Sequence, residues 1–469
     1  MARNPTLRRC EALLAGLEPD FTFEPPPPVP ETEYADRVRR VRHEAAQAGL
    51  DAVVLHTDIA AFYHASNSYL RYLCDWIKEG VLVVATDASR APVLLSFFST
   101  SVLMPPPGEA VGVDDIRQTG QWGRETYDRP GDVNGKLAVA TRGILEELGA
   151  DRGRIGLIGD ALSDRFFAAL GEEAVGAAFQ RAGAIIDRMQ RVRTTSEQAQ
   201  FRAAAQLVDL GLQAAFHVIR PGVSDFEIYA AFTFAQMARG GEAGDGCQIG
   251  IGPHGPHVSK PYGRIVRAGD LVGLYASNVP YRGYWAQAAR MVAVGEIARE
   301  CETLIEVCLE AHRRGLAACA AGVLVRDVNN AAFSALVERG MIDSPEARAM
   351  PWAFAPGADG SPLPVPVRTI PDRDLEGQGR ALRHLYPAVR GPIDGPRFGH
   401  GITMPDMPGY SVISSNLDRL ETGQALVLHA QWVEPGRAGC NIGGSVLITD
   451  DGIEDLNCHT PIAPHRVPA

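Results

Sequence analysis

Hydrophobic residues in the first 190 positions recur in short runs with two different spacings. In "YADRVRRVRHEAAQAGL" (34–50) they return at helical spacing, and the pattern ends at a Gly. The runs "DAVVLHT", "GVLVVAT", "APVLLSF" and "RIGLIGD" are typical of strands. This alternation of helices and strands predicts a mixed α/β domain with a mainly buried sheet.

The second half of the chain begins with a long helical pattern. Thr194 and Glu197 have the spacing of a capping box, and the predicted helix ends at Arg220, before a Pro-Gly pair. The same spacing recurs at Ser224 and Glu227, where another helix is predicted to begin. "GDLVGLYASNVPYRGYWAQAARMVAVG" then has the pattern of two strands joined by a turn, and "QALVLHAQWV" and "GGSVLITDDGIEDL" close the chain as strands.

These patterns, together with the length of 469 residues, predict more than one domain, because one hydrophobic core rarely grows so large. We predict an N-terminal arm and Pro-rich tether over 1–30, a small α/β domain over 31–190 and a second α/β domain over 191–469. A Pro- and Gly-rich insertion at about 341–395 is too long for an ordinary connection. It lies just before "FGHGI", so a lid and a dimer contact are both open as its role.

The net charge and the positions of the cysteines disfavour some classes of partner and cellular compartment. The net charge of −11 disfavours a nucleic-acid partner, which would need a basic face. We expect no membrane partner, because no apolar stretch is long enough to span a bilayer and the N-terminus does not have the pattern of a signal peptide. The eight cysteines are scattered without a C-x-x-C pair, which favours reduced thiols and a cytoplasmic protein.

Several motifs in order resemble the creatinase/prolidase/methionine aminopeptidase superfamily over roughly residues 34–460. They are "YADRVRRVRHEAAQAGLDAVVLHT", "RTTSEQAQFRAAAQLVDLGLQAAFHVIRPGVSDFEI", "RIVRAGDLV", "GYWAQAARMVAVG", "FGHGI" and "LETGQALVLHA". The resemblance implies a small α/β N-terminal domain followed by a pita-bread α/β domain. It also implies a homodimer in which the N-terminal domain of one subunit lies near the active site of the other.

The peptidases of this superfamily hold two divalent metals with two Asp, one His and two Glu. The resemblance places these ligands at Tyr275, Gln287, His400, His429 and Gly443 or Gly444. Only His400 keeps the ligand of the family, and every carboxylate is replaced. Two such ions need several hard oxygen donors to bridge and neutralise them. We therefore predict no dinuclear metal site and no cofactor.

Creatinase works on the same fold without a metal, and the chain is similar to it. This resemblance implies hydrolysis of a C–N bond in a guanidino compound with a histidine as general acid/base, which matches His257. The glutamates that hold the guanidinium in creatinase match Ala289, His429, Gly443 and Gly444 here. Since a cation would lose its counter-charges, an anionic or neutral substrate is expected.

The resulting prediction is a metal-independent hydrolase or lyase that cleaves a C–N or other C–heteroatom bond of a small polar metabolite. Its predicted catalytic residues are His257, His400, His429 and Tyr275. Histidine titrates near neutral pH and suits acid/base work, and a tyrosine can donate to a developing oxyanion. Its predicted substrate-binding residues are Gln287, Arg290 and Arg397.

Other interpretations of the same residues remain open. His429 also fits a buried core histidine, His400 a turn-packing residue, and Tyr275 and Gln287 fillers of the space that metals would occupy. His400 and His429, together with His257 or Gln287, could bind a single Zn, Fe or Ni ion in a mononuclear enzyme. A third hypothesis is a non-catalytic protein that uses the same cleft to bind a peptide or a partner protein.

Overall fold

A computed structural model of the chain divides into two compact units. They comprise Pro27–Arg191, and Met1–Pro26 together with Val192–Ala469. The structure describes residues 5–61, 64–65, 67–96, 111–119, 133–244, 246–253, 260–342, 352–356, 362–366, 397–402, 404, 406–434 and 438–469. Most of the predicted insertion at 341–395 therefore lies outside the described residues.

The unit Pro27–Arg191 is built on a six-stranded mixed sheet in the order β6-β5-β4-β1-β7-β8. β1 pairs antiparallel with β4 and parallel with β7, and all its residues are buried. Its main strands are β1 (Ala52–Thr57), β4 (Gly80–Ala85), β5 (Val93–Ser96), β6 (Asp115–Gln118), β7 (Arg154–Ile158) and β8 (Ala178–Arg181), with β2 (Ile59–Ala61) and β3 (His64–Ala65) pairing apart from it. Its helices are α2 (Glu31–Gln47), α3 (Tyr69–Cys74), α5 (Val133–Glu147), α6 (Asp164–Glu173), α7 (Ala184–Met189) and the short 3₁₀ turn η2 (Ala161–Ser163).

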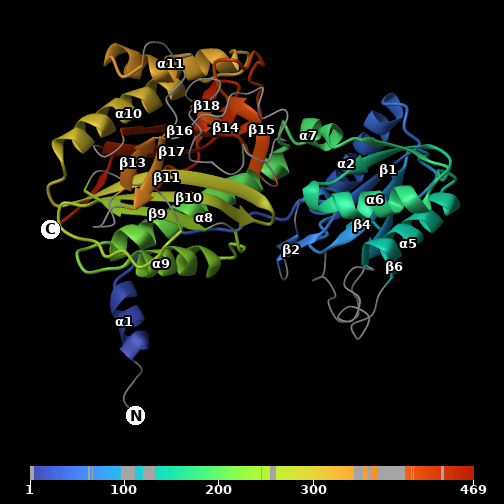
Figure 1. Ribbon diagram of the computed structural model, residues 1–469, viewed down its shortest axis with the longest axis horizontal. Helices are drawn as coiled ribbons and strands as arrows, with labels where there is room; N and C mark the ends of the chain where they lie inside the picture. Colours follow the sequence, from blue (N-terminus) through green and yellow to red (C-terminus); the bar gives the residue numbers. More distant parts are fainter. Residues whose placement is uncertain are drawn as a thin grey trace. The chain divides into compact units, whose positions relative to one another are not determined.

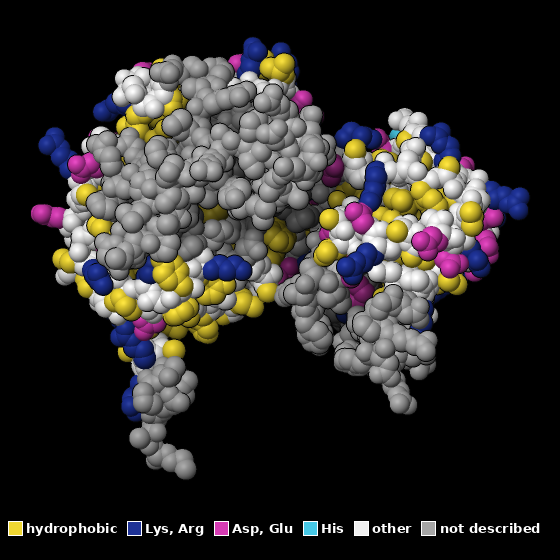
Figure 2. Space-filling view, in the orientation of Figure 1, with side chains coloured by type: hydrophobic (Ala, Val, Ile, Leu, Met, Phe, Trp, Pro, Cys, Tyr) yellow, Lys and Arg dark blue, Asp and Glu magenta, His cyan; other side chains and the backbone are white. Residues whose placement is uncertain are grey.

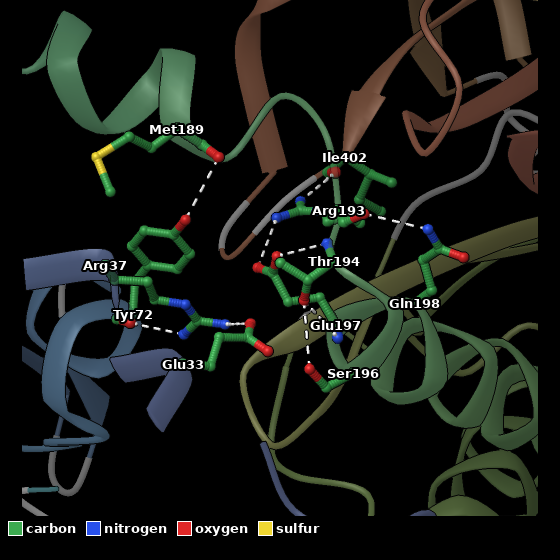
Figure 3. Close-up of polar contacts among 10 residues, drawn as sticks. All are labelled: Glu33, Arg37, Tyr72, Met189, Arg193, Thr194, Ser196, Glu197, Gln198 and Ile402. Carbon is green, nitrogen blue, oxygen red and sulfur yellow. Dashed lines mark hydrogen bonds and ion pairs between the residues drawn. The ribbon is translucent and has the colours of Figure 1, made fainter. Parts of the chain in front are cut away.

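The continuous apolar runs of this unit form its central strands, because a strand covered on both faces needs no polar side. α2 buries its apolar stripe against them, and Arg37 on its inner side donates to Glu33 and to the carbonyl oxygen of Tyr72, both at 2.7 Å (Figure 3). The structure confirms the predicted mixed α/β class of this unit.

The other unit is built on a nine-stranded sheet whose main path is β15-β14-β16-β17-β11-β10-β9. β18 pairs with β17, and β19 pairs with β11. The strands are β9 (Cys247–Gly252), β10 (Leu271–Tyr281), β11 (Tyr284–Val294), β14 (Gly399–Ile402), β15 (Asp406–Val412), β16 (Ala425–Glu434), β17 (Ala438–Thr449), β18 (Gly452–Asp455) and β19 (His465–Val467), with the separate hairpin β12 (Trp352–Pro356) and β13 (Pro362–Pro366). The helices are α1 (Pro5–Leu14), α8 (Thr195–Val218), α9 (Asp225–Met237), α10 (Arg299–Ala318) and α11 (Val325–Glu338).

Two hydrophobic cores hold these helices on the sheet. The arrangement of the helices around the strands can be followed in Figure 1. α8 and α9 pack against the β9–β11 end, and α10 and α11 against the β14–β17 end. Figure 2 shows hydrophobic side chains gathered on the outside of this unit, over α9. No helix among the described residues is long and apolar enough to cross a membrane.

The capping boxes at Thr194 and Ser224 are confirmed, since each side chain accepts from the backbone N–H three residues on. α8 ends at Val218, two residues before the predicted end at Arg220. Ile219 is already extended, and Arg220 precedes a proline, which disfavours helical backbone at that position. The predicted strand pair is confirmed as the β10–β11 hairpin.

Candidate functional site

Four strands place one row of residues across the sheet. Tyr275 on β10 pairs with Ala289 on β11, which pairs with Gly443 on β17, which pairs with His429 on β16. The rings of Tyr275 and His429 approach edge to face, with centroids 6.1 Å apart. The two residues between them, Ala289 and Gly443, have a small side chain or none. The strand register and these small residues together allow the rings of Tyr275 and His429 to approach each other.

A hydrogen bond fixes the phenol of Tyr275. Its hydroxyl donates to Oε1 of Gln287 at 2.7 Å. The backbone of Gln287 is held in turn by Ser445 on β17, whose hydroxyl accepts from the Gln287 N–H and donates to its carbonyl oxygen, both at 3.0 Å. The amide that holds the tyrosine is therefore anchored across two strands.

His400 on β14 lies beside His429, with ring centroids 5.8 Å apart in an edge-to-face arrangement. Nδ1 of His400 lies 2.9 Å from the carbonyl oxygen of Gly401. A carbonyl can only accept, so Nδ1 carries a proton. In the neutral ring this leaves Nε2 as the basic nitrogen of His400.

The imidazole of His429 is buried, and neither ring nitrogen has a hydrogen-bond partner among the residues that the structure describes. Burial lowers the pKa of His429 well below its usual value, and the basic groups His400, Arg397 and His312 add to this shift. The ring is therefore neutral at pH 7. A buried polar group without a partner costs about 1–3 kcal/mol. Such a cost, together with a perturbed pKa, is typical of functional sites.

The two predicted arginines are placed differently. Arg397 is exposed two residues before β14, and its charge helps to lower the pKa of His429. Arg290 is buried, and its guanidinium donates to backbone carbonyl oxygens of Ala289, Gly443, Asn457 and Thr460. These carbonyls enclose the Arg290 guanidinium, and its charge adds to the lowering of the pKa of His312. Its placement favours a structural role over the predicted substrate contact.

His257, the remaining predicted catalytic residue, lies outside the described residues. The sequence interpretation missed His312 on α10, which is buried and bonded to the backbone of Leu428, the neighbour of His429. Burial lowers its pKa to about 4. A polar residue on the apolar face of a predicted helix was the available signal.

A second missed residue is Arg193, which precedes α8. Its guanidinium donates to the carbonyl oxygen of Ile402 at 2.7 Å and lies 3.6 Å from the buried carboxylate of Glu197 (Figure 3). Ile402 ends β14, the strand that carries His400. Arg193 therefore ties the start of α8 to the strand that holds a histidine of the cluster.

Residues 199–450 match the family model of metallopeptidase family M24, which covers more than half of the chain. The chain belongs to this family. Uncharacterized peptidases of Staphylococcus aureus strains USA300 and MSSA476 are each 21% identical over 277 residues, which cover 58% of this chain and 64% of theirs. The match thus spans less than two thirds of the length of these relatives.

Solved structures share the fold of this M24 protein. The Xaa-Pro dipeptidase from Bacillus anthracis superposes with a TM-score of 0.66 at 20% identity, covering 92% of this chain and 100% of that one. The prolidase from Pyrococcus horikoshii OT3 gives 0.65 at 15% identity, with 90% and 98% covered. The predicted superfamily, with a smaller α/β domain before a pita-bread domain, is confirmed.

The residues of this M24 protein do not fit the pair of divalent metals that the superfamily implies. A Cβ at Gly443 would lie 2.2 Å from the carbonyl oxygen of Leu428, and one at Gly444 would lie 2.7 Å from Oδ1 of Asn457. A side chain at Gly443 would collide with backbone, whereas one at Gly444 would require the side chain of Asn457 to move. Imidazole, phenol and amide groups do not replace the bridging carboxylates of a dinuclear site. Within the described part of the chain, no group of three or more His, Cys, Asp or Glu could hold a metal.

Proposed function

We propose that this M24 protein is a hydrolase or lyase that cleaves a C–N or other C–heteroatom bond of a small polar metabolite without a metal ion. The observation that carries the proposal is the neutral, buried ring of His429, which lies against His400 and Tyr275. A ring that has no hydrogen-bond partner in the described protein is available to bond a substrate or a water.

The proton-handling roles follow from the hydrogen bonds. His400 holds its Nδ1 proton on the carbonyl of Gly401, so Nε2 accepts a proton from water or from the substrate. In the structure the hydroxyl of Tyr275 donates to Gln287. In the reaction it rotates and donates instead to the substrate oxygen that becomes negative as the bond breaks. His429 binds the substrate as a neutral donor and acceptor. His257 keeps its predicted acid/base role as part of this proposal.

The charge around the cluster selects the substrate. The groups whose charges shift the pKa of His429 are all basic, and Arg397 is the exposed one among them. Among the described residues, no acidic group contributes to the pKa shift of His429, so a guanidinium or ammonium group would meet only basic neighbours of that ring, whereas a carboxylate would be attracted. We therefore propose an anionic or neutral substrate rather than a cation such as creatine.

Two further predictions join this proposal. We propose a cytoplasmic protein, supported by the eight cysteines, all of which are free thiols. We also propose a homodimer, in keeping with the resemblance to the superfamily.

The test is a substrate screen on protein that has been treated with a chelator. The panel contains N-carbamoyl, N-acyl and amidino derivatives of amino acids, and Xaa-Pro dipeptides because solved relatives carry the names dipeptidase and prolidase. Turnover by the chelated wild type is expected. His429→Asn and Tyr275→Phe should each lower kcat roughly 10²-fold or more, as expected for acid/base or oxyanion groups.

His43→Asn, which removes an exposed ring from the other unit, is the control and should keep full turnover. Activity that appears only when Mn²⁺, Co²⁺ or Zn²⁺ is added would contradict the proposal and favour the mononuclear metal enzyme. Full turnover by both site variants would remove His429 and Tyr275 from the mechanism.

A further inference from the structure

The backbone of Phe398 connects helix α11 with the ring cluster. Asn329 on α11 is fully buried, and its Oδ1 accepts from the backbone N–H of Phe398 at 3.0 Å. The carbonyl oxygen of Phe398 in turn accepts from the backbone N–H of His429 at 2.7 Å. One residue therefore joins a side chain of the helix to the strand that carries the buried histidine.

The side-chain amide of Asn329 has one orientation. Its Oδ1 faces a backbone N–H, which can only donate, so the amide nitrogen lies on the other side. There it donates to Oγ of Ser414 at 3.1 Å, and Ser414 donates onward to Oδ1 of Asn330 at 2.6 Å. Because the donor end of the amide is bonded to Ser414, its acceptor end stays directed at Phe398.

The ring of Phe398 is fixed from the apolar side as well. It is buried against Gly315 on α10, where a Cβ would collide with the ring, and it meets Phe333 on α11 edge to face, with centroids 6.4 Å apart. The N–H of Phe398 is also shared with the carbonyl oxygen of Val412 on β15, at 3.0 Å. Phe398 is thus held by α10, α11, β15 and β16.

Arg397 depends on this anchor because it precedes the strand ladders. β14 pairs with both β15 and β16, so His400 within it is held on both sides. Both ladders begin after Phe398, and the N–H that Asn329 binds belongs to the peptide bond between Arg397 and Phe398. The exposed guanidinium of Arg397 therefore extends from a fixed peptide. Its charge acts on the neighbouring ring, since it lowers the pKa of His429.

We propose that Asn329 is a positioning residue for substrate specificity: it holds the peptide of Arg397 so that the guanidinium stays beside His429 and pairs with a carboxylate of the substrate. This inference rests on the proposed function and narrows its substrate from anionic or neutral to anionic. A guanidinium presents a planar fork of donors that fits a carboxylate. Fixing the backbone below it reduces the ordering cost of binding, so the anchor increases affinity for the anion.

The experiment compares the binding of two probes by calorimetry, N-carbamoylglycinate and its neutral amide. The wild type should bind the anion roughly 5-fold more tightly, as expected for one exposed ion pair. Arg397→Gln should abolish this preference. Asn329→Leu keeps the branched shape of the side chain but removes the acceptor, and it should lose most of the preference. The double variant should behave like Arg397→Gln alone, because Asn329 acts through Arg397.

Ser414→Ala is the matched control, because it removes the hydrogen bond at the other end of the same amide and spares Phe398. It should keep the preference for the anion. Asn329→Ser, whose shorter side chain also removes the acceptor, is the second variant if Asn329→Leu does not fold, and the same loss is expected.

A preference that survives the loss of the Asn329 acceptor, or that Ser414→Ala loses equally, would overturn the inference. A wild type that binds both probes equally, or neither, would also overturn it. Turnover in the substrate screen is a separate measurement. Its absence, with the preference for the anion intact and dependent on Asn329, would contradict the proposed reaction alone.

Discussion

The backbone excludes a side chain at Gly443, one of the two positions, with Gly444, at which the resemblance places a metal-binding carboxylate. The φ of Gly443, +148°, lies in a region that favours glycine, and a Cβ there would lie 2.4 Å from Cα of His429 as well as against Leu428. Restoring the ligand by a single substitution is therefore not possible without moving β16. The obstacle to a carboxylate at Gly443 therefore lies in the backbone as well as in the missing side chain.

Gly443→Ala tests this exclusion. Gly452 provides a matched control, since its φ is +138° but nothing lies within 4 Å of its Cβ position. Gly452→Ala carries backbone strain alone, about 1–3 kcal/mol. Gly443→Ala should lower the free energy of unfolding by roughly 1–3 kcal/mol more, because the methyl group also clashes with packed backbone. Urea unfolding of both variants measures the difference. Equal losses would show that β16 moves aside easily.

At the scale of elements, the sequence predicts contacts between residues close in the chain but not contacts between distant ones. The capping boxes at Thr194 and Ser224 were predictable because the donor and acceptor lie three residues apart. The resemblance places Tyr275 and His429 in one predicted site. The contact between their rings depends on the pairing of four strands, which the sequence does not specify. The acceptors of Arg290 lie up to 170 residues away, so its enclosure by carbonyls had no sequence signal.

Arg193 shows how one such long-range contact supports the site. Arg193→Met removes the bond to Ile402 and leaves the carboxylate of Glu197 buried without its cation. Breaking a buried pair in this way costs about 3–5 kcal/mol. Arg202→Met is the control, because Arg202 pairs with Glu454 near the surface, where a pair contributes about 1 kcal/mol or less.

Chemical unfolding of the two variants gives these values directly. If Arg193→Met cost no more than Arg202→Met, the contact between the start of α8 and β14 would contribute little to the fold. The adjacent histidine on β14 would then be held by the sheet alone.

At the scale of the whole molecule, buried histidines in both units make the fold sensitive to acid. Burial lowers the pKa of His56 and of His312 to about 4, and it lowers that of His429 well below its usual value of 6.5. The unfolded chain therefore binds more protons than the folded one below pH 6.5. The folded state therefore has its full free energy of unfolding from these groups above pH 6.5, and this contribution is lost as the pH falls toward 4. Each group contributes at most about 1.4 kcal/mol per pH unit.

Asp209 acts in the opposite direction. Burial raises its pKa from 3.8 to about 6, so the folded chain binds one more proton than the unfolded chain between these values. Stability from this group increases as the pH falls through 6, and it offsets part of the histidine effect. Burial also lowers the pKa of His465 and raises those of Asp187 and Asp270, in smaller shifts on either side of this balance. Since three histidines with large shifts oppose Asp209, we expect a net loss of stability between pH 6.5 and 5.

Urea unfolding at pH 7.5, 6.5, 5.5 and 5.0 tests this balance. His312→Gln should reduce the pH slope by up to about 1.4 kcal/mol per unit below pH 6.5. Asp209→Asn should increase the loss on acidification below pH 6, because the offsetting group is gone. His43→Asn removes an exposed ring and serves as the control. If the stability of Asp209→Asn, which lacks the offsetting group, also stayed level from pH 7.5 to 5.0, the buried rings would be gaining protons inside the fold, and the neutral state assigned to His429 would have to be abandoned.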